Sequence, residues 1–219
     1  MDKGRLLKIA TVKENAKTVA NNQLLAQVES EMLASLAVLQ QAIAVLRAPI
    51  AAAAELLIGA LQTDHTIFSC GNGGSAADAQ HFSAELLGSY LRPRAALRAM
   101  ALTTDTSSLT SIANDQAYDQ VFSRQLQGLG RAGDVLLAIS TSGNSPSVVE
   151  VVNTAHQLDM HCVLLSGREG GELATMIRPG DIEIRVPAHA TARIQEVHGL
   201  VIHCLCDLID RTFAEEQET

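Results

Sequence analysis

After residue 64 the chain alternates short aliphatic runs with segments that have helical spacing. The aliphatic runs predict strands at residues 66–70, 97–102, 134–140, 161–166 and 182–186. The other segments predict helices at residues 75–89, 107–129, 145–158, 171–176 and 192–213. Strands that alternate with helices form a parallel sheet with helices on both faces. The sequence therefore predicts an α/β fold with a five-stranded parallel sheet, whose ligands we expect beyond the carboxyl ends of the strands.

The region before residue 64 is predicted to be helical. Residues 1–22 are polar and lack clear periodicity, so we expect a mobile extension or a frayed helix start. From Leu24 to Leu46 apolar residues recur at spacings of three and four, which predicts an amphipathic helix that Pro49 ends. A second helix is predicted from Ala51 to about residue 62. The apolar stripe can pack on its own domain or on another subunit, and its regular spacing favours the subunit. The predicted domains are an extension (1–22), N-terminal helices (23–63), an α/β domain (64–215) and a tail (216–219).

The composition argues against nucleic acid and membranes as partners. The 219 residues carry a net charge of -8 and only 3% are aromatic, whereas duplex binding needs a basic surface and single-strand binding needs aromatic platforms. The longest nearly apolar stretch, residues 48–61, contains Glu55 and is shorter than the roughly 20 residues of a membrane-spanning helix. The amino terminus lacks the apolar core of a signal peptide, so we expect a cytoplasmic protein. Its cysteines, which we interpret as reduced and buried apolar side chains, are Cys70, Cys162, Cys204 and Cys206.

A glycine-rich loop, residues 71–76, lies between the first strand and the following helix. Glycines let the backbone approach a ligand, and the free N–H groups of a helix start attract anions. A dinucleotide site is one interpretation, but the acidic residue that should hold the ribose, Asp105, comes about ten positions too late. A Walker A loop is excluded because no Gly-Lys-Ser or Gly-Lys-Thr is present.

A second loop, residues 140–146, has the sequence Ser-Thr-Ser-Gly-Asn-Ser-Pro and also joins a strand to a helix. Ser145 and Pro146 are typical of the N-cap and first position of a helix. The preceding hydroxyls can hold a phosphate at the positive end of the helix dipole without a cation. A single loop of this kind is equally consistent with a polar turn and with an anion site. Two such loops together favour an anionic small-molecule site.

Candidate groups for proton transfer lie on two predicted helices. His81 and Glu85 are four residues apart and share a helix face. Gln195 and His203, eight residues apart, are turned by only about 80° from each other. A packing role is the default for a histidine on an apolar helix, including His198. We also interpret four further histidines as surface or packing residues: His65, His156, His161 and His189.

Four separated segments of the chain resemble the phosphoheptose isomerases, which are sugar isomerase (SIS) domain proteins. These segments are CGNGGSAADAQHFSAEL (70–86), LTTDTSSLTSIANDQAYDQVFSRQ (102–125), GDVLLAISTSGNSPSVV (133–149) and ARIQEVHGLVIHCLCDLID (192–210). The resemblance runs from about residue 24 to residue 213 and implies a three-layer αβα domain with a flavodoxin-like sheet. It also implies a homotetramer whose N-terminal helices form a central bundle. The reaction that it implies is the aldose–ketose isomerisation of sedoheptulose 7-phosphate to D-glycero-D-manno-heptose 7-phosphate through an enediol, in lipopolysaccharide heptose synthesis.

The same resemblance implies roles for individual residues. Glu85 would be the base that moves the carbon-bound proton, and His203 its acid-base partner. The phosphate would be held by Ser140, Thr141, Ser142 and Ser145. Further residues lining the substrate site would be Asn72, Gly73, Gly74, Ser75, Asn114, Asp115 and Gln195, although a structural turn is the default for the Asn114-Asp115 pair. One zinc ion per subunit would be bound by His81, Glu85, Gln195 and His203, a plausible donor set for zinc.

Some features leave alternatives open. A carboxylate on zinc is a poorer base, so either Glu85 leaves the metal to act or the metal itself polarises the substrate. Ser89 stands where the family often has an arginine, for which Arg92 or Arg94 could substitute, and Ala192 stands where some members have an aspartate. The main alternative function is that of a non-catalytic SIS tetramer that binds the replication initiator DnaA. A sugar-phosphate-binding regulatory module is a second alternative. Because the chain keeps Glu85 and His203 together with His81 and Gln195, the enzyme is favoured.

Overall fold

The structure is a computed structural model that describes the backbone of residues 3–214 and the side chains of residues 21–214. The predicted tail, residues 216–219, lies outside the described residues. By its internal contacts the chain forms two units, Met1–Gln40 and Gln41–Thr219. The division falls inside the first helix, α1 (Lys3–Gln62), whereas the sequence suggested a boundary near residue 63. This helix already includes the residues from Lys3 onward, for which the sequence suggested a mobile extension or a frayed helix start.

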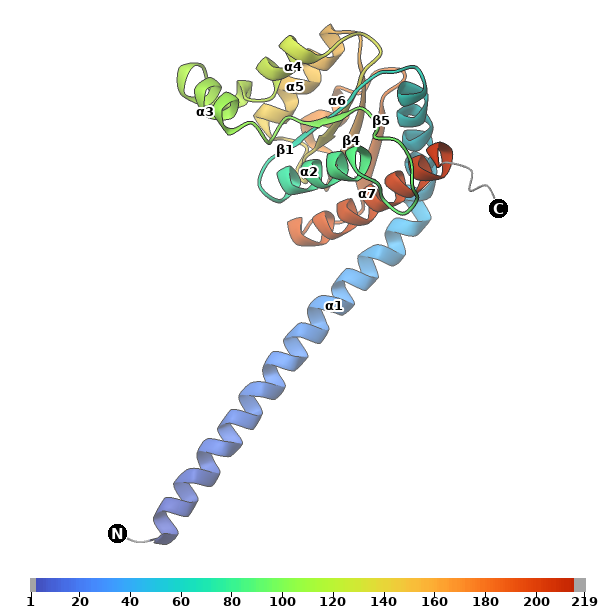
Figure 1. The fold of residues 1–219 in the computed structure, drawn as a ribbon. Helices are drawn as coiled ribbons and strands as arrows, with labels where there is room; N and C mark the ends of the chain where they lie inside the picture. Colours follow the sequence, from blue (N-terminus) through green and yellow to red (C-terminus); the bar gives the residue numbers. More distant parts are fainter. Residues whose placement is uncertain (1–2, 215–219) are drawn as a thin grey trace. The chain divides into compact units, whose positions relative to one another are not determined.

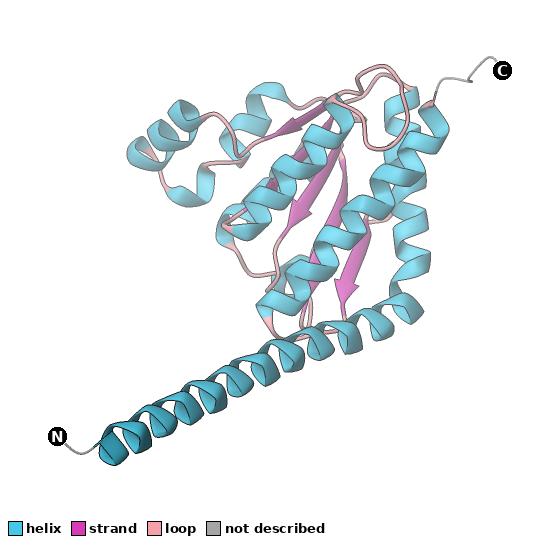
Figure 2. Cartoon of the chain, turned by 60° about the horizontal axis from the view of Figure 1, so that its bottom comes forward, coloured by secondary structure: helices cyan, strands magenta, loops and turns pink. Residues whose placement is uncertain are grey.

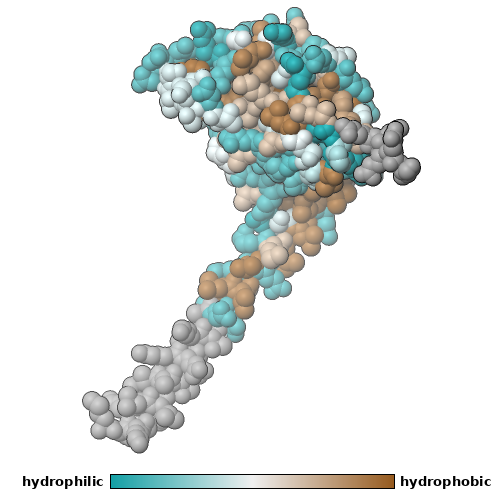
Figure 3. Space-filling model, in the orientation of Figure 1, coloured by the Kyte–Doolittle hydropathy of each residue, from teal (hydrophilic) through white to brown (hydrophobic). Residues whose placement is uncertain are grey.

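The first unit is the helix α1 up to Gln40. Its described part exposes large apolar side chains, which appear as brown patches in Figure 3. These side chains are Leu24, Leu25, Val28, Met32, Leu33 and Leu36. By length and composition alone, one helix segment in the described part of the chain, Asn21–Gln62, is apolar enough to cross a membrane, in contrast to the expectation from the sequence.

Pro49 does not end the first helix, so this prediction from the sequence is wrong. Proline removes one backbone hydrogen bond and kinks a helix, and packing of the flanking turns can hold the helix together across it. On both sides of Pro49, apolar side chains of α1 are buried in the second unit, among them Leu46, Ala53 and Leu57. The last turns of α1 are therefore part of the buried core of the second unit.

In the described residues five strands form one sheet, shown in magenta in Figure 2. The strands are β1 (Ile67–Gly71), β2 (Ala99–Ala101), β3 (Val135–Ile139), β4 (His161–Gly167) and β5 (Ile182–Val186). Their order is β2-β1-β3-β4-β5, and every neighbouring pair is parallel. The central strands are buried on both faces, which explains their continuous aliphatic sequences. The predicted five-stranded parallel sheet is confirmed.

Helices cover both faces of the sheet (Figure 1). Phe68, Leu136 and Cys162 lie side by side in the strand register and face a core that includes residues of α4 (Ser123–Leu129) and α5 (Pro146–Gln157). On the alternate face of β1, the Ser69 hydroxyl donates to the carbonyl of Ala79 in α2 (Gly74–Leu87). The helix α7 (Thr191–Phe213) packs beside α2, and the short α6 (Gly171–Thr175) follows β4.

The predicted helix at residues 107–129 is interrupted in the structure. It consists of α3 (Thr106–Asp115), a 3₁₀ turn η1 (Tyr118–Gln120) and α4. At the end of α3, Asn114 Nδ2 donates to Asp115 Oδ1 at 2.7 Å, and such local side-chain bonds compete with helix continuation. The predicted strand at 97–102 is also shorter than expected, because only Ala99–Ala101 pair with β1.

Candidate active site

The glycine loop and the hydroxyl loop leave neighbouring strands of the sheet. The first follows β1 and the second follows β3, and these strands pair from Ile67↔Val135 to Gly71↔Ile139. Because β1 is also the strand from which the order reverses toward β2, both loops lie at the topological switch point of the sheet. Crevices at this point are the usual ligand sites of open α/β sheets. The two loops therefore begin at the ends of adjacent parallel strands.

The hydroxyl loop leads into α5 through Ser145. Ser145 occupies the N-cap position and Pro146 the first helical position, as the sequence predicts. Within the described residues, however, the Ser145 side chain makes no capping hydrogen bond, and its hydroxyl lies 3.0 Å from that of Ser140. The Ser145 side chain therefore does not cap α5, and the backbone N–H groups and the dipole at the start of this helix can attract an anion.

Gly143 shapes the hydroxyl loop through its left-handed backbone, with φ of +67°. A Cβ atom at this position would collide with the carbonyl oxygen of Gly170, in the loop that follows β4. The Gly143 carbonyl accepts a hydrogen bond from Leu173 N at 3.0 Å, and Asn144 Oδ1 accepts one from Glu172 N at 2.9 Å. The segment after β4 thus fixes the hydroxyl loop by hydrogen bonds from its backbone N–H groups.

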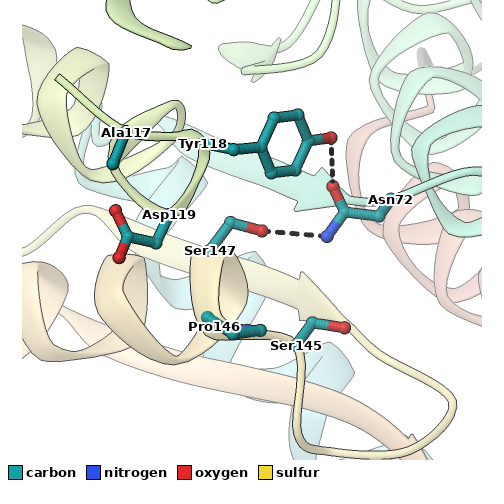
Figure 4. A pocket seen from close by; sticks show the side chains of 7 residues that line it. All are labelled: Asn72, Ala117, Tyr118, Asp119, Ser145, Pro146 and Ser147. Atoms are coloured by element: carbon teal, nitrogen blue, oxygen red, sulfur yellow. Dashed lines mark hydrogen bonds between the residues drawn. The ribbon is translucent and has the colours of Figure 1, made fainter.

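Asn72 connects the glycine loop to the start of α5. Its Nδ2 donates to Ser147 Oγ at 2.9 Å, and its Oδ1 accepts from the hydroxyl of Tyr118 at 2.8 Å (Figure 4). These three residues line a cavity of about 370 Å³ together with Ala117, Asp119, Ser145 and Pro146. The cavity is large enough for a sugar phosphate and has the uncapped end of α5 in its wall.

The helices α2 and α7 bring the second set of predicted residues to the same region. Gly74, the first residue of α2, packs against the side chain of Gln195, and a Cβ at Gly74 would collide with the amide nitrogen of Gln195. Seven residues further along α2, His81 meets His203 of α7, with ring centroids 5.0 Å apart in an edge-to-face arrangement. The two helices therefore run side by side in the same direction.

His81, Glu85 and His203 form one cluster on this helix pair. His81 Nε2 lies 3.1 Å from Glu85 Oε1, which confirms that they share a helix face. Tyr90 stacks on His203 with a centroid distance of 5.6 Å. The side chains of His81 and Glu85 are partly exposed, at 40% and 24%, so a ligand can reach them. The arrangement provides a carboxylate and two imidazoles, which can accept, donate or share protons or bind a metal ion.

The two arginines that could replace a family arginine at Ser89 have other partners. The Arg94 side chain is only 1% exposed and its Nε donates to Asp210 Oδ1 at 2.6 Å. Arg92 Nη1 lies 2.8 Å from Asp207 Oδ1. Both carboxylates are on α7, so these pairs fix the loop after α2 to that helix. The idea that Arg92 or Arg94 serves as the missing pocket cation is therefore not supported.

The other predicted residues have mixed placements. Ser75 is buried at the start of α2, and Thr141 and Ser142 are half-buried in the hydroxyl loop. Asn114 and Asp115 are exposed, bond to each other and do not line the cavity described above. Asp105 caps α3 by accepting from Ser107 N and Ser108 N. These hydrogen bonds lower the pKa of Asp105, that with Ser108 most strongly, and they favour the capping role over the ribose ligand of a dinucleotide.

The sequence reasoning missed Tyr118, Ser147, Tyr90 and Asp78. The 3₁₀ turn that presents Tyr118 was hidden by the helical pattern of residues 107–129. Burial raises the pKa of the Tyr90 phenol, and the nearby Cys206 and Asp207 raise it further. Asp78 lies one turn before His81, and its Oδ2 is buried without a hydrogen-bond partner among the described residues. Burial raises the pKa of Asp78, while His81 opposes the shift. The spacing of Asp78, His81 and Glu85 on one helix face was the available signal.

Comparison with protein families gives a match to the SIS domain model over residues 32–167. A phosphoheptose isomerase from Chromohalobacter salexigens is 58% identical over 159 residues, which cover 73% of this chain and 81% of that protein. A phosphoheptose isomerase from Coxiella burnetii is 55% identical over 177 residues, covering 81% of this chain and 89% of that protein.

Among solved structures, the phosphoheptose isomerase from Neisseria gonorrhoeae superposes with a TM-score of 0.82 and 51% identity. The match covers 86% of this chain and 99% of that chain. Fold and sequence are thus similar to the same group of enzymes over most of the chain.

Proposed function

The chain belongs to the SIS domain family and is an isomerase of the phosphoheptose isomerase type, and we propose that Glu85 and His203 transfer the protons of its reaction. The substrate is sedoheptulose 7-phosphate and the product is D-glycero-D-manno-heptose 7-phosphate, in the first step toward ADP-heptose and the lipopolysaccharide core. None of the relatives named above supports the alternative of a protein that binds the replication initiator DnaA.

The observation that carries the mechanism is the cluster of His81, Glu85 and His203 on two adjacent helices. In an aldose–ketose isomerisation one proton moves from C1 to C2 and another moves from the C1 hydroxyl to the C2 oxygen. We assign the first transfer to Glu85, which removes the C1 proton to give an enediol and returns it to C2. We assign the transfer between the oxygens to His203, whose imidazole has one nitrogen that can accept a proton and one that can donate it.

The phosphate group is assigned to the hydroxyl loop, with Ser140, Thr141, Ser142 and Ser145 as ligands. The uncapped start of α5 and the adjacent cavity support this assignment. The rest of the sugar would be held by Asn72, Gly73, Gly74, Ser75 and Gln195. Asn114 and Asp115, which do not line the cavity, would be additional contacts outside it. The net charge of -8 does not oppose phosphate binding, because local backbone donors and a helix dipole act at much shorter range than the global charge.

The donor set on α2 and α7 fits a zinc ion. His81, Glu85 and His203 converge, and Gln195 lies on the same side of α7 two turns earlier. Two imidazoles, a carboxylate and an amide oxygen would be its ligands, in keeping with the chemistry of zinc sites. A zinc ion bound there would polarise the oxygens of the substrate as a Lewis acid. The chain's own residues orient the substrate and move its protons in either case.

The exposed apolar side chains of α1 support self-association, which we propose to be a homotetramer with the N-terminal helices at its centre. Isolated apolar residues on a surface are ordinary, but a continuous stripe from Leu24 to Leu36 indicates a binding surface. The alternative, insertion of Asn21–Gln62 into a membrane, conflicts with the burial of Ala53, Leu57 and Leu61 in the second unit. A cytoplasmic location suits an enzyme of a phosphorylated sugar.

The proposed function is tested with Glu85→Gln, which keeps the size of the side chain and removes its basicity. We expect turnover of sedoheptulose 7-phosphate to fall by at least about 10²-fold, the low end for general acid-base catalysis, while KM changes little. Exchange of the C1 proton with deuterated water should fall by the same factor. Glu150→Gln on α5 is the matched control, with expected wild-type turnover. Unchanged turnover in Glu85→Gln would reject Glu85 as the base, and wild-type protein inactive on this substrate would reject the function itself.

A further inference from the structure

Three side chains with different metal-binding donors meet at the amino ends of the strands, on the opposite side of the sheet from the candidate active site. His156 lies near the end of α5, Cys162 is the second residue of β4, and Asp181 directly precedes β5. Their donor atoms, an imidazole nitrogen, the thiol sulfur and a carboxylate oxygen, all lie within 4.8 Å of one another. Since all strands are parallel, this cluster is at their amino ends, whereas the two substrate loops leave at the carboxyl ends.

The carboxylate of Asp181 is oriented by the backbone and not only by the histidine. Its Oδ1 accepts from Cys162 N at 2.8 Å and its Oδ2 from Arg178 N at 2.9 Å. A carboxylate offers about four acceptor positions, so these bonds leave lone pairs for a further ligand. One of them receives His156 Nε2 at 2.8 Å. A cation placed between the imidazole and the carboxylate would replace this one hydrogen bond and leave the backbone bonds intact.

The side chains of the cluster are buried in the protein, but a cavity lies next to them. The side chains of His156 and Asp181 are 3% and 1% exposed, and Cys162 is completely buried. Next to them is a cavity of about 330 Å³ whose lining includes His156, His161, Arg178 and Asp181. The cavity provides a path for an ion and space for a water molecule as an additional ligand. Burial on the protein side is the condition under which such a site excludes competing water.

The charges of the cluster also fit a divalent cation. Coordination to a divalent ion stabilises a thiolate, so the Cys162 thiol would release its proton to water on binding. One carboxylate and one thiolate then neutralise a doubly charged ion, which removes the cost of an isolated buried charge.

We propose that His156, Cys162 and Asp181 form a binding site for a zinc-like transition metal ion, with a water from the cavity as fourth ligand. Nitrogen, sulfur and oxygen donors in this number are typical of zinc and cobalt sites, whereas calcium and magnesium prefer oxygen donors alone. The ion would tie the end of α5 to the starts of β4 and β5. This site is separate from the cluster of His81, Glu85 and His203, and its existence does not depend on the proposed reaction.

Cobalt distinguishes the two sites because only this one has a thiol among its proposed ligands. The full-length chain is freed of metal with a chelator and titrated with Co²⁺ while the near-ultraviolet absorption is recorded. We expect a thiolate-to-cobalt charge-transfer band that saturates at one ion per chain. Cys162→Ser, which is nearly isosteric, should abolish the band while isomerase activity and the circular dichroism spectrum stay at wild-type levels.

Two matched variants identify the source of the band. Cys204→Ser removes the half-buried thiol next to His203 and should leave the band unchanged. Glu85→Gln weakens the other candidate site and should also leave it unchanged. Metal analysis after dialysis against Zn²⁺ should find one ion fewer per chain in Cys162→Ser than in the wild type. The absence of a thiolate band at saturating Co²⁺, or a band that persists in Cys162→Ser, would overturn the proposal.

Discussion

Arg94 Nη2 donates a hydrogen bond of 2.6 Å to the main-chain carbonyl oxygen of Glu85, the residue proposed as the base. The same guanidinium donates to the carbonyl of Leu86 at 2.8 Å and to Asp210 Oδ1 at 2.6 Å. Asp210 in turn accepts from Leu91 N and Arg92 N. A buried ion pair between the loop after α2 and the helix α7 therefore fixes the backbone at Glu85 relative to the helix that carries His203.

Asp210→Asn is predicted to weaken both stability and turnover. Burial raises the pKa of Asp210, but the hydrogen bonds from Leu91 N, Arg92 N and Arg94 outweigh this and keep the pKa below its usual value. The substitution leaves the buried Arg94 charge without a counterion, which costs about 3 kcal/mol of unfolding free energy, measured by urea denaturation. Displacement of Glu85 should lower kcat at least about tenfold while KM changes less, because the phosphate loop is not touched.

Asp207→Asn is the matched control for this prediction. Asp207 pairs with Arg92 on the same loop and the same helix, but its side chain is 27% exposed. Partly exposed pairs contribute less than about 1 kcal/mol, so stability and kcat should stay near wild-type values. Equal losses of kcat in the two variants would show that Arg94 has no particular role in positioning Glu85.

Tyr118→Phe is predicted to weaken substrate binding. The Tyr118 hydroxyl donates to Asn72 Oδ1, and this bond orients the amide that reaches Ser147. Loss of one neutral hydrogen bond corresponds to about 1 kcal/mol, so KM for sedoheptulose 7-phosphate should rise about fivefold with little change in kcat. Since Tyr118 is 61% exposed, the melting temperature should not change. An unaltered KM would mean that the substrate itself, and not Tyr118, orients Asn72.

The elements that the sequence predicts are those set by local or periodic rules. Buried parallel strands have continuous aliphatic runs, and β3 and β5 were located to within a residue at each end. The pairing of His81 with Glu85 follows from helix geometry alone. In contrast, the contact of Arg94 with Asp210 joins residues 116 positions apart, and no spacing rule connects them.

Where the structure differs from the sequence-based predictions, the cause is again a contact between residues distant in the sequence. Pro49 was expected to end a helix, but burial of Leu46 and Leu57 in the second unit holds the helix on both sides of it. His156 and Cys162 looked uninformative because their common partner, Asp181, comes from a turn that only the folded sheet brings to them. Tertiary packing thus keeps α1 continuous across Pro49, and it also brings together the cluster of His156, Cys162 and Asp181.

Gly143→Ala is predicted to impair substrate binding more than folding. A residue with a Cβ is strained at φ of +67°, by roughly 1–2 kcal/mol, and the new methyl group must also displace the loop that carries Gly170. Movement of the hydroxyl loop changes the phosphate site, so KM should rise at least about tenfold. Isothermal titration with inorganic phosphate or the substrate measures the loss directly.

Gly128→Ala provides the control for the glycine substitution. Gly128 is exposed within α4, and a Cβ there would meet nothing within 4 Å. Replacement of a helical glycine by alanine should raise stability by up to about 1 kcal/mol and leave KM unchanged. If Gly143→Ala also binds its substrate normally, the conformation of this loop does not determine the phosphate site.

The stability of the fold should fall between pH 8 and pH 5 because of His198. This side chain is completely buried on α7, and its Nε2 donates to the carbonyl oxygen of Ser166 at 2.9 Å. Burial lowers the pKa of His198 to about 4, although the hydrogen bond to Ser166 opposes the shift. Below the ordinary pKa of about 6.5 the unfolded chain therefore binds a proton that the folded chain does not. The folded state loses stability as the pH falls, by about 2 kcal/mol between pH 8 and pH 5.

His198→Gln separates this contribution from that of the other titrating groups. Glutamine can still donate to the Ser166 carbonyl but does not titrate, so the variant is expected to be less stable at pH 8 and to lose less stability on acidification. Urea denaturation of both proteins at pH 8 and pH 5 gives the two differences. The wild type should lose about 2 kcal/mol more than the variant over this range. The same pH dependence in both proteins would show that His198 takes up its proton in the folded state as readily as in the unfolded chain.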